Sequence, residues 1–309
     1  MSHLLSFSFF QEEIMRKKID SAFSILIYLL TACSIMALGF VIYFIVKEAL
    51  PLFQEVSLSE FLLGKRWMPI DYTGTTAFGI FNFIVATVYV SFTAMILAVG
   101  IGFGASVFLS CVATESMCGI LYPFVDLLAG IPSVVYGFIG LQVLVRIFLK
   151  AGVRTGTCVL AAGILLAVML LPFLVSSCSE TIRKEKKKYE AAAAALGIGR
   201  WYAIATIILP ASWKNILLSM ILAIGRAMGE TMAVMMVMGN ANLFPRLLGK
   251  SESIASVIAL EMGTAEYGST HYHALYGAGL VLMLLLFIIN VGINMLRRRI
   301  VSNQGRDAE

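Results

Sequence analysis

The sequence has 309 residues, of which 60% are hydrophobic and only 13% are charged, and its mean hydropathy is +0.90. A water-soluble domain carries about 25% charged residues, so a soluble protein is excluded and lipid must surround much of this chain. The net charge of +5 does not indicate nucleic-acid binding, because the basic residues gather in short blocks beside apolar runs.

Six apolar runs are long enough to cross a bilayer as helices, which takes about 20 residues each. They cover residues 22–46, 84–109, 120–145, 158–178, 216–238 and 276–296. The first run is too long for the apolar core of a cleaved signal, so we expect it to remain as a membrane helix. The sequence predicts an all-α membrane protein with one transmembrane domain over residues 22–300, a cytoplasmic N-terminal segment 1–21 and a cytoplasmic tail 301–309.

The distribution of basic residues predicts the orientation of these spans. With the N-terminus in the cytoplasm, the inner segments hold 14 of the 23 basic residues, and the outer segments hold eight. Cytoplasmic loops carry the excess of Lys and Arg in membrane proteins, so both termini are expected in the cytoplasm of a bacterial cell membrane. Three bases in one outer segment, Arg146, Lys150 and Arg154, weaken this bias.

The third span contains residues that interrupt a helix. Pro132 removes a backbone donor and is expected to kink the span, while Gly130 and Gly137 loosen it on either side. Ser133 and Tyr136 add hydroxyl groups. Irregular backbone at membrane depth is tolerated where it lines a cavity or is buried in protein. This segment is therefore predicted to form a helix break beside a polar path.

The loop between the fourth and fifth spans, about residues 179–215, is the most polar long stretch of the chain. Glu190 opens a run of five alanines that ends at Leu196 and Gly197, and Pro210 closes the following stretch. Alanine favours helix and glycine ends it, so two short helices around a glycine break are predicted. Such a projecting loop suits docking to a partner. A solvated hairpin without a special role fits the pattern equally well.

The fifth span carries two charges, Arg226 and Glu230, which a continuous helix places on one face. Charges at this depth cost about 2.5–3.5 kcal/mol each and normally face a protein interior or a watery path. One interpretation is a structural ion pair between helices. The other is that Arg226 offers its forked donors to a passing anion while Glu230 orients it.

Other patterns do not indicate a site. Gly249-Lys250-Ser251 lacks the first glycine of a phosphate-binding loop, where Phe244 stands instead. Two histidines, His271 and His273, have no third metal ligand near them in the sequence, so no metal site is predicted. The five cysteines form no CxxC pair. No arrangement typical of enzyme chemistry or of cofactor binding occurs, and a transport function without a cofactor is expected.

Five segments resemble a known family. The alanine run through Leu196 and Gly197, followed by Leu209 and Pro210, is similar to the EAA loop of ABC importer permeases. Segments 128–137 and 225–234 resemble the phosphate branch, the PstC family of permease subunits, as do Lys47-Glu48-Ala49-Leu50-Pro51 and Trp67-Met68-Pro69. The resemblance covers about residues 22–300. In one departure, the glutamate of the EAA motif would fall at Ala191, whereas this chain has Glu190.

The resemblance implies the MetI-like permease architecture and half of a translocation path for inorganic phosphate. It further implies a PstA-like sister permease, a cytoplasmic PstB-like ATPase dimer and an outer PstS-like phosphate-binding protein. Arg226 and Glu230 match the charged pair of the family's path, which we expect Ser133 and Tyr136 to join. The ATPase would dock at residues of the EAA loop, namely Glu190, Ala191, Ala192, Gly197 and Pro210. ATP would bind to the partner ATPase and not to this chain.

Alternative functions remain open at this stage. A permease for another oxyanion, such as sulfate or molybdate, shares the same class. A secondary anion transporter could also use Arg226 and Glu230, but it would not need the projecting loop. A structural or signalling membrane protein is disfavoured by an arginine within a span. The Gly-Arg-x-x-Gly-Glu segment and Trp67-Met68-Pro69 favour phosphate among these alternatives.

Overall fold

The computed structural model describes the backbone of residues 2–69 and 76–306, and the side chains of residues 23–69, 76–292 and 294–295. Within this part of the chain, six helical stretches are long and apolar enough to cross a membrane, which confirms the expected number. They are Phe23–Glu55, Phe81–Val112, Ser133–Lys150, Val159–Ala195, Arg200–Met228 and Thr270–Gly292. The side chains of the expected segments 1–21 and 301–309 lie outside the described residues.

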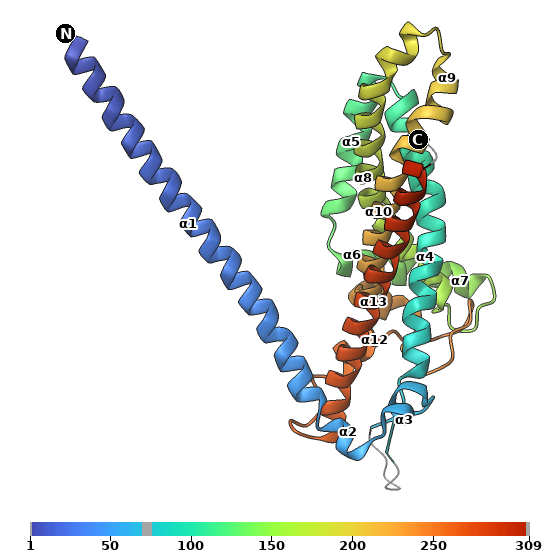
Figure 1. Cartoon of the computed structure of the whole chain (residues 1–309). Coiled ribbons are helices and arrows are strands. Elements are labelled where there is room, and N and C mark those ends of the chain that lie inside the picture. Colours follow the sequence, from blue (N-terminus) through green and yellow to red (C-terminus); the bar gives the residue numbers. More distant parts are fainter. Residues whose placement is uncertain (1, 70–75, 307–309) are drawn as a thin grey trace.

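Helix α1 (Ser2–Ala49) stands away from the rest of the molecule (Figure 1). The C-terminal part of α1 meets another helix, α13 (Thr270–Arg306). The contact includes an edge-to-face pair between Phe44 and Tyr276, whose ring centroids are 5.7 Å apart. Every side chain in residues 23–43 is exposed. Because this stretch is strongly apolar, lipid or another chain must cover it.

Short helices and strands form a cap over the end of the molecule where α1 ends. It consists of α2 (Leu52–Glu55), α3 (Leu58–Leu63), the antiparallel strands β1 (Trp67–Met68) and β2 (Ala77–Phe78), and α12 (Ile254–Glu261). The side chain of Ser57 accepts a hydrogen bond from the backbone N–H of Glu60 and so caps α3. The apolar centre of the cap is formed by Leu52, Phe61, Trp67, Phe78, Ile80, Phe83, Ile254 and Val257.

One carboxylate joins three parts of the cap. Glu261 of α12 accepts a hydrogen bond from the indole N–H of Trp67 at 2.8 Å, and the ring of His271 lies 2.8 Å from the same oxygen. His273 bonds instead to the backbone oxygen of Glu48, at 2.7 Å. The two histidines therefore serve separate contacts, and no group of three metal-ligating side chains occurs among the described residues.

Replacing Gly79 with alanine should destabilise the cap by about 2 kcal/mol, because the added methyl group cannot be accommodated. A Cβ at Gly79 would lie 2.3 Å from the carbonyl carbon of Gly64 and 2.4 Å from its oxygen. The check is the midpoint temperature of thermal unfolding in detergent. Gly263→Ala is the matched control in the same end of the molecule, since a Cβ there meets nothing within 4 Å. Equal midpoints for the two variants would contradict the close contact.

Glu252, just before α12, makes the stability of the cap depend on pH. Its side chain is 6% exposed. Burial and the nearby charge of Glu261 raise its pKa from 4.5 to about 7. The folded state then binds more protons than the unfolded chain between these values, so stability should fall as pH rises from 4.5 to 7, by about 3 kcal/mol at most.

Glu252→Gln should remove this loss and flatten the dependence over that window. Unfolding midpoints measured from pH 5 to pH 8 on wild type and variant test this, because the difference between the two curves isolates residue 252. Parallel curves would show that the Glu252 carboxyl does not titrate in this range.

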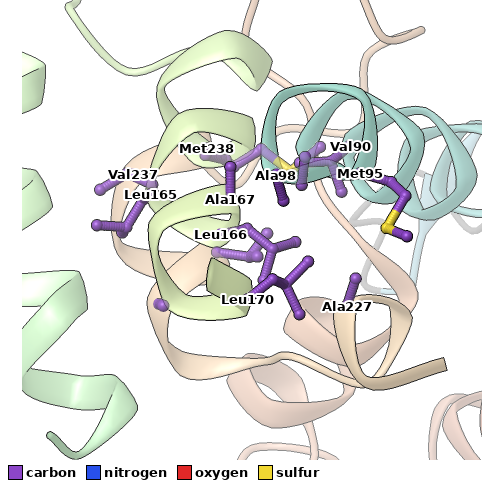
Figure 2. Packing of buried hydrophobic residues seen from close by; sticks show 14 of the residues in the cluster. Val90, Met95, Ala98, Leu165, Leu166, Ala167, Leu170, Ala227, Val237 and Met238 are labelled. Atoms are coloured by element: carbon purple, nitrogen blue, oxygen red, sulfur yellow. The ribbon is translucent and has the colours of Figure 1, made fainter. Parts of the chain in front are cut away.

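The centre of the membrane domain is formed by α4 (Phe81–Val107), α8 (Val159–Ala195) and α10 (Leu209–Met228). Figure 2 shows Leu166 and Leu170 of α8 lying between Ala98 of α4 and Ala227 of α10. Small residues allow this close approach. A Cβ at Gly163 of α8 would lie 2.8 Å from the methyl carbon of Thr93 on α4. Small residues at helix contacts are typical of packing in membranes, where van der Waals contact replaces the hydrophobic effect.

The predicted third span is not one helix. Helix α5 (Glu115–Gly130) ends before Pro132, and α6 (Ser133–Ile139) begins directly after it. A π-helical turn then connects α6 to α7 (Val145–Lys150). The break predicted at Pro132 is confirmed, and the third span lies at Ser133–Lys150 in place of the expected 120–145. Pro132 adopts an extended conformation that a helix cannot continue through.

The fourth and fifth spans extend out of the membrane domain and meet at a projecting turn, residues 190–203, which lies at the end opposite the cap (Figure 1). Helix α8 runs on to Ala195 and ends in a glycine motif. Gly197 has a φ of +70°, and Ile198 N–H bonds to the oxygen of Ala193 at 2.9 Å. The glycine break is thus confirmed, but its first helix is the end of a 37-residue helix and not a separate short one.

After the glycine break, the chain is helical again from Arg200. Helix α9 (Arg200–Ala203) leads through a π-helical turn, Ile204–Ile208, into α10. Pro210 stands in the first turn of α10. Proline lacks the N–H of a regular helix, and the wider π turn before it accommodates that loss. Helix α11 (Met232–Met238) follows α10 after a second break.

Candidate translocation cavity

Two helix breaks and the long helix α8 surround one cavity of about 660 Å³ in the membrane domain. The break between α5 and α6 forms one wall, the break between α10 and α11 forms another, and α8 with its internal Pro172 forms the third. The lining residues are Leu128, Ala129, Gly130, Ile131, Pro132, Ser133, Tyr136, Met169, Pro172, Phe173, Ser176, Ser177, Glu180, Arg226 and Glu230. Interrupted helices that enclose a cavity are the usual way in which transporters present backbone and charge to a substrate.

The structure brings together most of the path residues expected from the sequence. Arg226, Glu230, Ser133 and Tyr136 all line this cavity, although they come from two segments about 90 residues apart. Gly130 and Pro132, expected at the helix break, line it as well.

Gly137 is the exception among the residues expected at the break. It lies outside the cavity and packs against α11, where an added Cβ would meet the sulfur of Met236 at 2.6 Å and the Cα of Ala233 at 3.2 Å. Gly137 therefore permits the close packing of α6 on α11.

The break between α5 and α6 is bridged by a hydrogen bond. The hydroxyl of Tyr136 donates to the backbone oxygen of Leu128 at 2.9 Å. Leu128 lies in the last turn of α5, where carbonyl groups have no partner within the helix. Tyr136 thus stabilises the end of one helix from the start of the next. The Ser133 hydroxyl belongs to the first turn of α6.

The fifth span contains a break that the sequence analysis did not predict. Helix α10 ends at Met228, and Glu230 lies between α10 and α11. A carboxylate oxygen of Glu230 accepts a hydrogen bond from the N–H of Ala233 at 3.3 Å, which caps the start of α11. The expectation that Arg226 and Glu230 share one face of a continuous helix was therefore wrong. Gly229, a poor helix former, stands at the point where α10 ends.

Arg226 and Glu230 form no ion pair in the described part of the chain. The side chain of Arg226 is exposed and that of Glu230 is partly buried, and both reach the same cavity. This arrangement does not support the structural ion pair considered above. It leaves the guanidinium group free to bind an anion in the cavity.

Three polar residues of α8 also line the cavity, and the sequence analysis missed them: Ser176, Ser177 and Glu180. The hydroxyls of Ser177 and Ser219 are 2.6 Å apart, which joins α8 to α10. Ser176 and Glu180 are four residues apart and so share a face of α8. That i, i+4 spacing is the signal that could have identified them, once the helix is known to continue past Cys178.

The residues expected to contact an ATPase lie on the surface of the projecting turn or beside it. Glu190, Ala191, Ala192, Gly197 and Pro210 are all exposed. The carboxylate of Glu190 lies 3.7 Å from the ammonium group of Lys186. Three large side chains of the turn are also exposed, Leu196 by 77%, Trp201 by 67% and Tyr202 by 64%. Apolar side chains at a polar end of the molecule mark a surface for another protein.

Comparison with known proteins places this geometry among transport proteins. Residues 117–302 match the family described as "Binding-protein-dependent transport system inner membrane component". The chain is 34% identical over 248 residues to the probable ABC transporter permease protein YqgH of Bacillus subtilis, with 79% of each chain covered. It is 32% identical over 296 residues to the phosphate transport system permease protein PstC of Xylella fastidiosa, covering 87% of this chain and 90% of that one.

The fold has also been seen in a solved structure. A chain of the MetNI methionine ABC transporter, in an inward facing conformation, matches with a TM-score of 0.55 and 17% identity. The match covers 71% of this chain and 97% of the other. This likeness supports the predicted MetI-like permease architecture.

Proposed function

The chain belongs to the family of binding-protein-dependent transport system inner membrane components, and on that premise we propose that it forms half of the translocation path for inorganic phosphate. As a member of this family it is a multi-pass membrane subunit of an ABC importer and not an enzyme. The family works with an ATPase and a substrate-binding protein. The observation that carries the proposal is the placement of Arg226 in a cavity enclosed by interrupted helices.

The chemistry of the cavity favours phosphate over sulfate. Arg226 supplies a positive charge and a fork of N–H donors that match two oxygens of a tetrahedral anion. The cavity also contains two carboxylates, Glu180 and Glu230, which can only accept hydrogen bonds when ionised. Phosphate keeps at least one proton near neutral pH and can donate it to a carboxylate, whereas sulfate has none to donate. The carboxylates would therefore repel sulfate without compensation.

Hydroxyl groups complete the site that we propose. Ser133, Ser176 and Ser177 can donate to anion oxygens. Ser133 stands in the first turn of α6, which places its hydroxyl on the cavity wall. Because one chain forms only half of this path, a PstA-like sister permease would form the other half.

The projecting turn is the proposed contact with a PstB-like ATPase. Its exposed Leu196, Trp201 and Tyr202 provide the apolar anchors, and Glu190 to Ala192 flank them on α8. The position of the motif glutamate, Glu190 in place of residue 191, shifts the contact by about 100° around the helix. Both positions are exposed, so either face of this last turn can meet the partner.

The proposed orientation puts the termini and the projecting turn in the cytoplasm. Figure 1 shows the start of α1 and the end of α13 toward the end that carries the projecting turn, opposite the cap. The basic blocks at 16–18, 183–188 and 297–299 then lie inside, as the positive-inside rule requires. The cap would face outward and receive a PstS-like phosphate-binding protein.

ATP-driven uptake of labelled phosphate and sulfate into proteoliposomes tests the proposal. The vesicles contain this chain, its sister permease and the ATPase, with the binding protein added outside. Phosphate uptake that needs all four proteins and is not reduced by excess sulfate is the expected result. Uptake of sulfate or molybdate instead of phosphate would show that the chain belongs to a permease for that oxyanion. Uptake by this chain alone, driven by an ion gradient, would indicate a secondary transporter.

A further inference from the structure

A second cavity, of about 440 Å³, lies where the start of α5 and the π-helical turn after α4 meet α8. We call it the basic cavity. Arg183, Lys186 and Lys187 line it from α8, and Glu115 and Glu190 contribute two carboxylates. It shares no lining residue with the translocation cavity. Its basic residues outnumber its acidic residues by one, and of these five charged residues only Glu190 takes part in the function proposed above.

The three bases are held differently. Lys186 is already engaged, because its ammonium group lies 3.7 Å from the Glu190 carboxylate and donates to the backbone oxygen of Ser110 at 3.4 Å. The guanidinium group of Arg183 lies over the ring of Tyr122, with 4.5 Å to the ring centroid. This contact fixes the side chain but leaves its charge unneutralised. Neither Arg183 nor Lys187 pairs with a carboxylate among the described residues.

The spacing of these bases suits one compact anion. Residues 183, 186 and 187 lie three and four positions apart, so they project from one face of α8 toward the same space. An arginine with fixed orientation beside a lysine is a common arrangement for binding a phosphate group. The other two bases of this segment, Lys184 and Lys188, do not line the cavity. Three of the five basic side chains in this segment therefore face the basic cavity.

We propose that the basic cavity binds one phosphate group, presented either by the headgroup of an anionic phospholipid or by free inorganic phosphate. Basic pockets between helices near a membrane surface recognise lipid headgroups in this way. Helix α5 starts beside the cavity and carries exposed apolar side chains, among them Met117, Ile120 and Phe124, which suit contact with acyl chains. The proposal does not depend on which anion passes through the translocation cavity.

The lipid source is tested on the chain purified with its partner subunits, by native mass spectrometry with phosphatidylglycerol and with phosphatidylcholine. Arg183→Gln with Lys187→Gln should weaken phosphatidylglycerol binding at least about tenfold. The matched control, Lys184→Gln with Lys188→Gln, removes the same charge from the same helix and should bind like wild type. Lys187→Gln alone, at an exposed position, serves if the double variant does not assemble.

The free-phosphate source is tested by equilibrium binding of labelled phosphate to the same complexes in phosphatidylcholine nanodiscs. Arg226→Gln is included throughout, so that the translocation cavity does not contribute. Phosphate binding that is lost with Arg183 and Lys187, but kept in the control, assigns the cavity to free phosphate. If neither phosphatidylglycerol nor phosphate distinguishes the two double variants, the proposal is overturned. The uptake assay with wild-type protein remains an independent test of the transport function.

Discussion

Arg226→Ala should lower ATP-driven phosphate uptake about 100-fold while the transporter still assembles. A hydrogen bond to a charged group contributes about 1.5–3 kcal/mol, and Arg226 can make two such bonds to one anion. It is also the only base among the described residues that line the translocation cavity. Removing it would leave no positive charge among these lining residues to offset the carboxylates of Glu180 and Glu230. Initial uptake rates in proteoliposomes, normalised to assembled complex, measure the effect.

Two further variants make this experiment specific. Arg226→Lys keeps the charge but loses the forked geometry, so an intermediate rate is expected. Arg146→Ala removes a base of α7 that bonds to Gln142 and lies outside the cavity, and uptake should not change. Full uptake by Arg226→Ala, with all partners assembled, would reduce Arg226 to a structural role at most.

Leu196→Asp combined with Trp201→Asp should release the ATPase from the complex. Exposed aromatic and large apolar side chains commonly dominate protein interfaces, and each contributes about 2 kcal/mol or more when it is buried by a partner. Losing two of them weakens binding by about 1000-fold, and a charge in an apolar contact adds to the loss. Copurification of the ATPase with this chain, and ATP hydrolysis stimulated by the binding protein, measure the result.

The control for the projecting turn is an aromatic residue of similar exposure at the opposite end. Tyr267 lies between α12 and α13 and is 79% exposed. Tyr267→Ala should retain the ATPase, because the cap would face away from it. An ATPase that stays bound after both aspartate substitutions, or after deletion of residues 190–197, would place its docking surface elsewhere on the chain.

Most of the fold follows from local patterns in the sequence. The apolar runs predicted the number of spans, because a bilayer requires about 20 apolar residues in a helix. Pro132 located the break in the third span, since proline blocks a helix whatever its surroundings. Gly197 located the break in the projecting turn for a similar reason, as glycine readily adopts the positive φ found there.

The features that were missed depend on contacts between segments. The break at Gly229 is stabilised by the Glu230 carboxylate, which bonds to the start of α11 instead of facing Arg226 along a helix. Glu180 was assigned to a polar loop because the apolar run ends near Cys178, yet α8 continues for 17 residues beyond that point. Gly137 was expected to loosen the helix break because it is a glycine, but it is needed for close packing against Met236 and Ala233. Local sequence does not distinguish these roles.

The length of α8 has a mechanical consequence. One uninterrupted helix carries Glu180 in the translocation cavity and Glu190 at the start of the projecting turn. Ten residues of α-helix span about 15 Å, and such a short helical segment behaves as a stiff rod. Pro172, where a bend would be easiest, lies on the far side of Glu180 from the projecting turn. A displacement or rotation of α8 at Glu190 must therefore move Glu180 as well. The cavity wall and the docking surface then move together as one rigid body.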